Sequence, residues 1–204
     1  MLIVGLTGSI GMGKSTLAAH LRARGIPVFD ADAEVHRLYA AEAAPLIEQA
    51  FPGTTSGGEV DRKLLTVALA KDPDRFKRLE AIVHPLVRAS ERAFLHASKS
   101  AGQAIAVLEI PLLLETGGDR LVDVVMLASA GPELQRQRVL ERPGMTREKL
   151  SLLLARQMSD AEKRRKADIV VDTGLELPQT LAKLDTVLDQ LASRTGKAFE
   201  RHWT

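Results

Sequence analysis

Hydrophobic positions along the chain fall into short apolar runs separated by longer stretches with helical spacing. The first run, Leu2–Leu6, predicts a buried strand, and the next stretch, 16–24, predicts a helix because Leu17, Ala18 and Leu21 recur on one face. Comparable runs predict four more strands at 27–29, 104–108, 123–128 and 168–171. Since helical segments separate these strands, we expect an α/β fold: a three-layer α/β/α sandwich around a five-stranded parallel sheet.

The stretch from 31 to 102 has helical spacing and is longer than a crossover between neighbouring strands requires. Asp61 predicts the N-cap of one helix, Pro73 opens a second, and Pro85 is expected in the first turn of a third. Glycine and proline between 52 and 58 predict a turn. We therefore interpret 31–102 as a helical insertion that binds the second substrate.

A basic segment follows a helix that is expected to start at Pro132. Ten lysines and arginines lie between 136 and 166, against four acids. Such a run is typical of a solvated helix face, but arginines on a closing segment also stabilise a transferring phosphoryl group. We interpret 138–166 as a helical lid, with Arg138 and Arg142 as candidate catalytic residues. The expected core comprises 1–30, 103–137 and 167–194.

The tail, 195–204, contains the single tryptophan, Trp203, and has no clear periodic pattern. Chain ends without such a pattern are commonly poorly ordered. We expect this tail to be loosely attached.

The segment between the first strand and the first helix carries the clearest chemical signal. It fits G-x-x-x-x-G-K-[ST], in which glycines let successive N–H groups point at phosphate oxygens and the helix N-terminus adds a favourable dipole. Lys14 is expected to reach the β- and γ-phosphates, and the Ser15 hydroxyl to ligate Mg²⁺. A glycine-rich turn that only caps a helix is the alternative. The candidate ATP-binding residues are Gly8, Gly11, Met12, Gly13, Lys14, Ser15 and Thr16.

Acidic residues follow two of the predicted strands. Asp32 comes just after the second strand, where ligands bind in open parallel sheets, but it is equally suited to cap a helix running from Ala33. Glu109 ends the third strand and is expected to steady Mg²⁺ through water, with an exposed strand end as the alternative. His84 precedes Pro85, and a histidine there is more typical of a hinge or cap than of a catalyst.

Composition narrows the class of protein without naming a reaction. Of 204 residues, 45% are hydrophobic and 26% charged, as in a globular domain, and the formal charge of +2 gives no sign of a nucleic-acid or membrane binder. The absence of cysteine excludes disulfides and thiolate metal sites and fits a reducing compartment. No apolar run approaches the ~18 residues of a membrane span and no signal-peptide layout is present, so we expect a cytoplasmic location.

A phosphate-binding motif after the first strand is shared by kinases, GTPases, motor ATPases and nucleotide-sensing modules. The chain lacks the N/T-K-x-D guanine signature of GTPases, and motor ATPases are normally longer. The insertion and the arginine-rich segment favour a small-metabolite kinase. Two alternatives stay open: a kinase acting on another metabolite, such as a nucleoside monophosphate or a sugar acid, and a non-catalytic ATP-binding module.

Further short motifs run through the chain in a fixed order. They are Leu6-Thr7-Gly8, Ile10-Gly11, Gly13-Lys14-Ser15-Thr16, Asp30-Ala31-Asp32, His84-Pro85-Leu86, Pro111-Leu112-Leu113 with Glu115, Thr146-Arg147-Glu148, Arg156-Gln157 and Ala167-Asp168. In this combination, from Leu6 to about Asp172, the chain resembles the dephospho-coenzyme A kinase family. The phosphate loop alone is generic, whereas the ordered set is discriminating.

The resemblance implies transfer of the γ-phosphoryl group of ATP, with Mg²⁺, to the ribose 3′-hydroxyl of dephospho-CoA, the last step of coenzyme A biosynthesis. It implies that Asp32 lies near that hydroxyl, that 31–102 contains the CoA-binding region and that 138–166 is the lid. Dephospho-CoA is then the small-molecule partner; the motifs specify no oligomeric state. The candidate substrate contacts are Asp32, His84, Pro111, Leu112 and Glu115.

The chain departs from the family pattern at two places. Ser9 and Met12 stand where the family's loop commonly has Gly and Ser, both at variable positions of the generic motif. Near the ATP base the family usually carries Asn and then Gly, where this chain has Asp172-Thr173-Gly174. The resemblance therefore assigns the phosphate contacts but not the adenine contacts.

Overall fold

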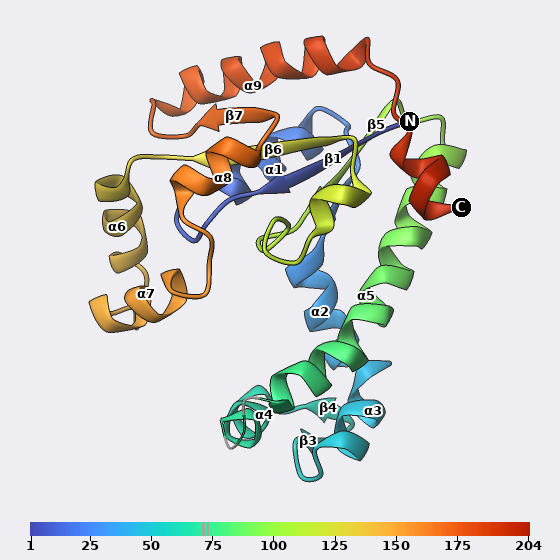
Figure 1. Ribbon diagram of the computed structural model, residues 1–204, viewed down its shortest axis with the longest axis vertical. Helices are drawn as coiled ribbons and strands as arrows, with labels where there is room; N and C mark the ends of the chain where they lie inside the picture. The colour runs from blue at the N-terminus through green and yellow to red at the C-terminus, as the bar shows by residue number, and fades with distance from the viewer. Residues whose placement is uncertain (71, 73) are drawn as a thin grey trace. The chain divides into compact units, whose positions relative to one another are not determined.

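The structure, a computed structural model, describes residues 1–70, 72 and 74–204, which divide into two compact units (Figure 1). The larger unit consists of 1–29 and 95–204, and the smaller of 30–94. In the sequence, the smaller unit is thus an insertion into the larger one. The functional assignments of 31–102 to substrate binding and of 138–166 to a lid stay predictions.

Five strands form the sheet of the larger unit, and they confirm the predicted α/β class. The strands are β1 (Leu2–Thr7), β2 (Val28–Asp30), β5 (Ile105–Glu109), β6 (Val124–Ser129) and β7 (Ile169–Asp172), in the order β2-β5-β1-β6-β7. β1 pairs in parallel with β5 and β6, and β6 in parallel with β7. The first strand in sequence is therefore the central one, and its carboxyl end leads straight into the glycine-rich loop.

Side chains alternate along the strands and meet a different layer on each face. In β6, Val124 and Met126 share a core with α1 (Lys14–Ala23) and α9 (Leu177–Ala192), whereas Val125 faces a second cluster built around Leu113 and Leu114. Met158 and Ala167, which flank α8 (Asp160–Lys166), pack against that second cluster. The sheet is therefore the middle of three layers, as predicted.

Two short helices and a 3₁₀ turn complete the larger unit before the last strand. They are α6 (Pro132–Leu140), α7 (Arg147–Leu154) and the turn Gly118–Leu121. Pro132 occupies the first turn of α6, as predicted, and Thr146 caps α7 by accepting the N–H of Lys149. Ser159 and Glu162 form a capping box at the start of α8, in which the Ser159 hydroxyl lowers the pKa of the Glu162 carboxyl.

The expectation of a loosely attached tail is wrong. Trp203 is fully buried in a π-helical turn (Phe199–Trp203), and its indole N–H donates to the Leu121 carbonyl at 2.8 Å. The Asp123 carboxylate, at the start of β6, accepts the backbone N–H groups of 197 and 198 and, with its other oxygen, the N–H of Ile3. One acid thus holds the tail to the central strand, although nothing periodic in the tail signals this.

The smaller unit packs four helices around its own apolar core. They are α2 (Ala31–Tyr39), α3 (Ala43–Ala50), α4 (Arg62–Leu69) and the first part of α5 (Asp74–Ser100), with buried Leu38, Ile47, Leu65 and Val83 at their contacts. Asp61 caps α4 as predicted. The predicted turn at 52–58 is part of a hairpin, β3 (Thr55–Ser56) and β4 (Glu59–Val60), whose loop residues Gly57 and Gly58 both have positive φ.

Pro85 does not start a helix, as the sequence suggested; it lies inside α5, which is continuous from Asp74 to Ser100. Proline removes one backbone hydrogen bond from a helix, but a helix of 27 residues has enough others, and a buried face that includes Val83 and Leu95, to continue through it. The predicted start at Pro73 lies outside the described residues.

Candidate functional site: a phosphate loop and its supporting shell

The phosphate loop, residues 8–15, joins β1 to α1 and needs glycine for its shape. Gly11 and Gly13 have φ of +77° and +80°, a region that other residues rarely adopt. A Cβ at Gly11 would lie 2.5 Å from Cγ2 of Val139 in α6, and one at Gly13 would lie 3.1 Å from Cβ of Thr173. Val139 and Thr173 therefore lie so close to the loop that a side chain at position 11 or 13 would be crowded.

The loop leaves a set of backbone donors available. Within the loop the Met12 N–H donates to the Ser9 carbonyl, and the Ile10 N–H donates to Oε1 of Gln157 at 3.3 Å. In the described part of the chain, the other N–H groups of the loop have no protein acceptor, and four of them, those of Gly11, Gly13, Lys14 and Ser15, lie at the start of α1. Because these donors surround a helix N-terminus, where the dipole favours negative charge, they form a nest suited to phosphate oxygens.

Lys14 is tied to the buried acid that ends β5. Its Nζ lies 2.8 Å from Oε1 of Glu109, whose other oxygen is 3.4 Å from Nη2 of Arg22. Glu109 is 3% exposed, so the alternative that it is merely an exposed strand end is wrong. The pair places the Lys14 ammonium, 15% exposed, beside the open donors of the loop.

One face of α6 packs against the phosphate loop. Gln135, Arg138 and Val139, spaced to share a helix face, all lie against the loop or its neighbours. Nε2 of Gln135 donates to the Ile10 carbonyl at 2.8 Å, and Nη2 of Arg138 donates to the Thr173 carbonyl at 2.8 Å. Nη1 of Arg138 is buried without a hydrogen-bond partner among the described residues. Arg138 is thus anchored beside the loop and retains one unused donor.

The residue after β7 adds a second support. The Thr173 hydroxyl lies 2.7 Å from the Met12 carbonyl and 3.1 Å from that of Ser129. The Met12 sulfur in turn accepts the Ala130 N–H at 3.1 Å. Met12, a variable position of the motif, is therefore a buried contact between the loop and the end of β6 rather than a solvent-exposed residue.

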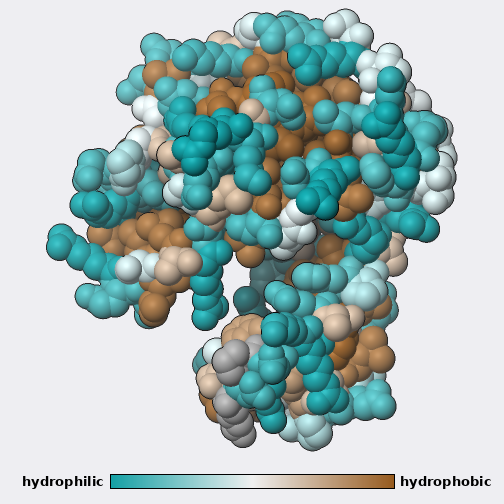
Figure 2. All heavy atoms as spheres, viewed as in Figure 1, coloured by the Kyte–Doolittle hydropathy of each residue, from teal (hydrophilic) through white to brown (hydrophobic). Residues whose placement is uncertain are grey.

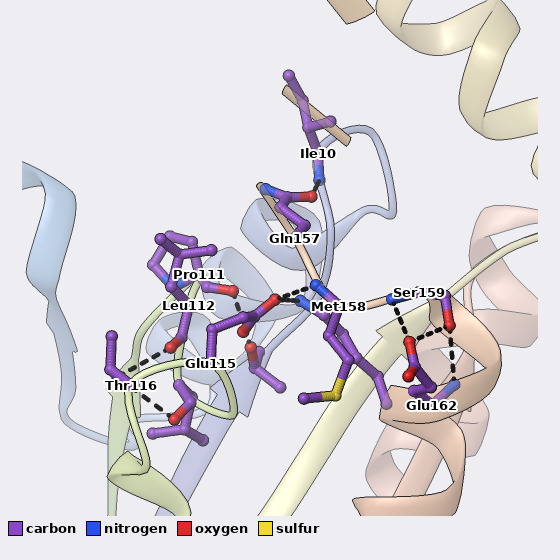
Figure 3. Close-up of polar contacts among 12 residues, drawn as sticks. Ile10, Pro111, Leu112, Glu115, Thr116, Gln157, Met158, Ser159 and Glu162 are labelled. Atoms are coloured by element: carbon purple, nitrogen blue, oxygen red, sulfur yellow. Dashed lines mark hydrogen bonds and ion pairs between the residues drawn. The ribbon is translucent and has the colours of Figure 1, made fainter. Parts of the chain in front are cut away.

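The connector between α7 and α8 reaches both the loop and the Pro-Leu-Leu-x-Glu segment (Figure 3). Gln157 bonds Ile10, as described above, and the next residue, Met158, donates its N–H to Oε1 of Glu115 at 2.8 Å. Nζ of Lys163, fully buried in α8, lies 2.9 Å from the same oxygen. Glu115 therefore bonds the end of 138–166, the segment predicted as a lid (the lid segment below), to the rest of the larger unit. Its contact with substrate stays a prediction.

The other residues of the Pro-Leu-Leu-x-Glu segment are also placed on the larger unit. The Pro111 carbonyl accepts the hydroxyl of Thr7, the last residue of β1, at 3.1 Å, and Leu112 is 38% exposed. Both lie at the carboxyl edge of the sheet, because the segment directly follows β5. Ser15 and Thr16 are exposed in the first turn of α1, and Arg142 is exposed after α6.

The smaller unit carries the two remaining predicted residues. Asp30, not Asp32, caps α2 by accepting the N–H of Ala33 at 2.9 Å, so the alternative that Asp32 caps a helix starting at Ala33 is wrong. Asp32 is exposed in the first turn of α2. His84 is exposed within α5, so it is neither a cap nor the hinge between two helices. Both side chains face solvent enough to meet a ligand.

Three supporting residues were not among the candidate site residues: Gln135, Gln157, which was noted only as part of a family motif, and Thr173, which was noted only in a departure from the family pattern. Each contacts a loop residue more than 120 positions away. For Gln135 the available signal was a polar residue that shares a helix face with apolar Val139, and its side chain is 7% exposed. Such a buried glutamine requires partners, but the sequence does not say which.

Comparisons with known proteins agree with one another. The family model described as dephospho-CoA kinase matches residues 2–179. A dephospho-CoA kinase from Mesorhizobium japonicum is 54% identical over 96% of this chain and 100% of its own length. The crystal structure of TT1252 from Thermus thermophilus is 37% identical, with a TM-score of 0.81 over 93% of this chain and 97% of its own.

A more distant solved structure supports the fold alone. The dephospho-CoA kinase from Campylobacter jejuni is 22% identical and superimposes with a TM-score of 0.65 over 93% of this chain and 96% of its own. The sequence matches are far closer, and they span the phosphate loop, the inserted unit and the basic segment together. This chain belongs to the dephospho-CoA kinase family.

Proposed function

We propose that the protein transfers the γ-phosphoryl group of ATP to the ribose 3′-hydroxyl of dephospho-CoA, giving coenzyme A and ADP. The observation that carries this proposal is the near full-length match to one kinase family, at 54% identity to a curated relative. The phosphate loop supports it, because four open N–H donors and the Lys14 ammonium gather at one helix N-terminus. In the described residues no helix is long and apolar enough to cross a bilayer.

The chain's own groups account for the binding of the polyphosphate. The open N–H groups of the loop donate to the β- and γ-phosphate oxygens, and Lys14 exchanges Glu109 for phosphate as negative charge moves to the β–γ bridge. Arg138 offers its unpartnered Nη1, and the exposed Arg142 adds a second guanidinium when the lid segment approaches. Both arginines stabilise charge on the transferring group without taking part in bond making.

Magnesium fits the donors present. Mg²⁺ prefers oxygen ligands and commonly keeps several waters, with phosphates and one or two protein oxygens completing its shell. The Ser15 hydroxyl and the Glu109 carboxylate are oxygen donors of this kind, and no cluster of three or more acidic or histidine side chains for another metal occurs in the described residues. When bound, Mg²⁺ neutralises charge on the phosphates; Ser15 and Glu109 would hold it, Glu109 once Lys14 has moved to phosphate.

The acceptor side is assigned to the smaller unit and to the segment after β5. Asp32 orients the ribose hydroxyl and takes up its proton. Since phosphoryl transfer passes through a loose transition state, orientation weighs as much as basicity. His84, Pro111 and Leu112 contribute contacts to the rest of dephospho-CoA.

A coupled assay of ADP release tests the proposal. Dephospho-CoA, AMP, gluconate and shikimate are offered in parallel with ATP, with and without Mg²⁺. We expect turnover that depends on dephospho-CoA and Mg²⁺, and a product whose new phosphate is on the 3′-oxygen by phosphorus NMR. Equal turnover with AMP, or phosphate at another position, contradicts the assignment.

A further inference from the structure

The open donors of the phosphate loop are oriented by bonds on the opposite side of the same peptide groups. In a planar trans peptide, the C=O of one residue and the N–H of the next point in opposite directions. No peptide in the described residues is cis. Whatever holds the carbonyl of one residue therefore fixes the direction of the following N–H.

Two of the open donors are fixed in this way. Gln135 holds the Ile10 carbonyl at 2.8 Å, and the partner N–H of that peptide belongs to Gly11. Thr173 holds the Met12 carbonyl at 2.7 Å, and the partner N–H of that peptide belongs to Gly13. In both peptides the carbonyl faces a protein side chain, and the N–H on the other side has no acceptor in the described chain.

The two supports are buried and joined to each other. Gln135 is 7% exposed and Thr173 is 5% exposed, so neither bond is weakened by competing water. Arg138, one turn after Gln135 on α6, donates to the Thr173 carbonyl at 2.8 Å. Glycine at 11 and 13 would otherwise make these peptides free to rotate, because glycine tolerates both signs of φ.

We propose that Gln135 and Thr173 are positioning residues for phosphoryl transfer: each holds a loop carbonyl so that the N–H groups of Gly11 and Gly13 face the nucleotide phosphates. The inference rests on the proposed function, since it names what prepares the loop for ATP. Neither residue touches the phosphates in this scheme. Their loss leaves the donors present but no longer held in one direction.

Substitutions of matched shape test the inference. Gln135→Met keeps the volume and removes the donor, while Thr173→Val removes only the hydroxyl. A hydrogen bond to a charged group contributes ~1.5–3 kcal/mol, so misdirecting one donor is expected to weaken ADP binding, measured by calorimetry, about tenfold or more. KM for ATP should rise in parallel, KM for dephospho-CoA should stay within about threefold, and Thr173→Ser, which keeps the hydroxyl, should restore ADP affinity.

Matched controls separate this role from general stability. Gln137→Met removes an exposed glutamine of the same helix that bonds Glu141, and Thr186→Val removes an exposed hydroxyl bonded within α9. Both controls should bind ADP normally at an unchanged urea midpoint. If Gln135→Met and Thr173→Val bind ADP as the parent does, or if Thr173→Ser is as weak as Thr173→Val, the inference is wrong.

A third variant distinguishes this failure from failure of the proposed site. If Lys14→Ala loses ADP affinity but Gln135→Met does not, the loop binds phosphate and the supports are not needed to orient it. If Lys14→Ala also binds ADP normally, the loop is not the phosphate site and both proposals fail. Should Gln135→Met fold poorly, the Thr173→Val and Thr173→Ser pair decides the inference alone.

Discussion

In the phosphate loop the carbonyls of Ser9, Ile10, Met12 and Gly13 have protein partners. The middle of the segment predicted as a lid, 138–166, by contrast has few bonds to the rest of the described chain. Gln135 and Thr173 hold loop carbonyls from buried positions. By contrast, Arg142 is exposed, its guanidinium makes no hydrogen bond or ion pair to any described residue, and Leu152 in α7 is 69% exposed. If both groups serve the proposed reaction, the backbone donors are held in place by the fold before ATP binds, whereas Arg142 reaches the phosphates only when its segment moves.

The surface view agrees with this contrast. Apolar and charged side chains lie side by side on the outside of α6 and α7 (Figure 2), where Leu152 and Leu153 are both more than one-third exposed. A segment with few buried contacts opens at low cost. Its end, however, is fixed, because Glu115 holds the connector after α7. The lid segment therefore makes few contacts around Arg142 and α7, whereas its end, from Met158 to Lys163, is bonded to Glu115.

The largest effect is expected in the phosphate loop, whose donors are held in place by the fold. Lys14→Ala should lower kcat by about 10³-fold or more, because the ammonium that follows the transferring charge is lost. It also leaves the buried Glu109 with Arg22 as its remaining cation, so some loss of stability is expected. Kinetics and urea unfolding measure the two effects.

A double variant separates them. Lys14→Met with Glu109→Gln should restore much of the free energy of unfolding without restoring kcat. Near-normal turnover in a folded Lys14→Ala enzyme would mean that the loop is not where phosphate binds.

Asp30 and Asp32, two positions apart, allow a structural role and a catalytic role to be distinguished. Asp32→Ala should lower kcat by about 10²–10⁴-fold with little change in KM for ATP, because Asp32 acts on the acceptor. Asp30→Ala should instead cost about 1 kcal/mol of unfolding free energy, since Asp30 caps α2, with kcat per folded molecule nearly intact.

Asp32→Asn then separates the two tasks of that carboxylate. If orientation dominates, Asn retains clearly more activity than Ala; if basicity dominates, the two are comparably slow. A normal kcat in Asp32→Ala would remove this residue from the mechanism.

Lys163→Met tests whether the ion pair with Glu115 holds the end of the lid segment in place. Lys163 is fully buried 2.9 Å from Glu115, and removing one partner of a buried ion pair typically costs 3–5 kcal/mol. Adding Glu115→Gln should recover part of that loss, because the uncompensated charge disappears. The urea midpoint measures both steps. Equal stability of Lys163→Met and the parent would show that the pair does not hold the base.

The smallest effect is expected at the free middle of the lid. Arg142→Ala should lower kcat by about 10²-fold with unfolding unchanged, because an exposed arginine without protein partners contributes only when the substrate is bound. The matched control is Arg136→Ala, which removes an exposed arginine of α6 that pairs with Glu133 one turn earlier. This variant should keep its activity.

Trypsin digestion tests whether the lid segment closes over the bound substrates. Cleavage after Arg147 and Lys149 should slow when ATP and dephospho-CoA are both bound. Unchanged cleavage with both ligands, together with a normal Arg142→Ala, would return this segment to the alternative of a solvated helix face.

Local patterns predicted the strands and the phosphate loop because both are determined by nearby residues. The apolar run of β1, the spacing of Gly8, Gly13 and Lys14, and the capping residue Asp61 all carry their meaning within a few positions. The strand order and the registers of β1 with β5 and β6 were not predicted, because they depend on which distant runs pair.

Features that depend on distant partners could not be predicted. The sequence placed Gln157 in a motif and Thr173 in a departure from one, but their contacts with Ile10 and Met12 depend on the fold and were not predicted. Pro85 was misread because a proline disfavours a helix locally, while the long helix that contains it is stabilised by packing along its whole length. The tail was misread for the same reason: Trp203 has no periodic neighbours, and its binding site is formed by Leu121 and His96.

That buried tryptophan has a consequence for how the protein is made. The inserted unit, 30–94, is continuous in sequence and has its own core, so it can fold while the ribosome is still translating. The larger unit cannot, because β1 lies between β5 and β6, which both follow the inserted unit in sequence, and the turn that buries Trp203 against Leu121 follows later still. Until then β1 has unpaired edges and is exposed to misassociation in the cell. β1 is therefore the strand of this sheet that stays longest without its partners during synthesis.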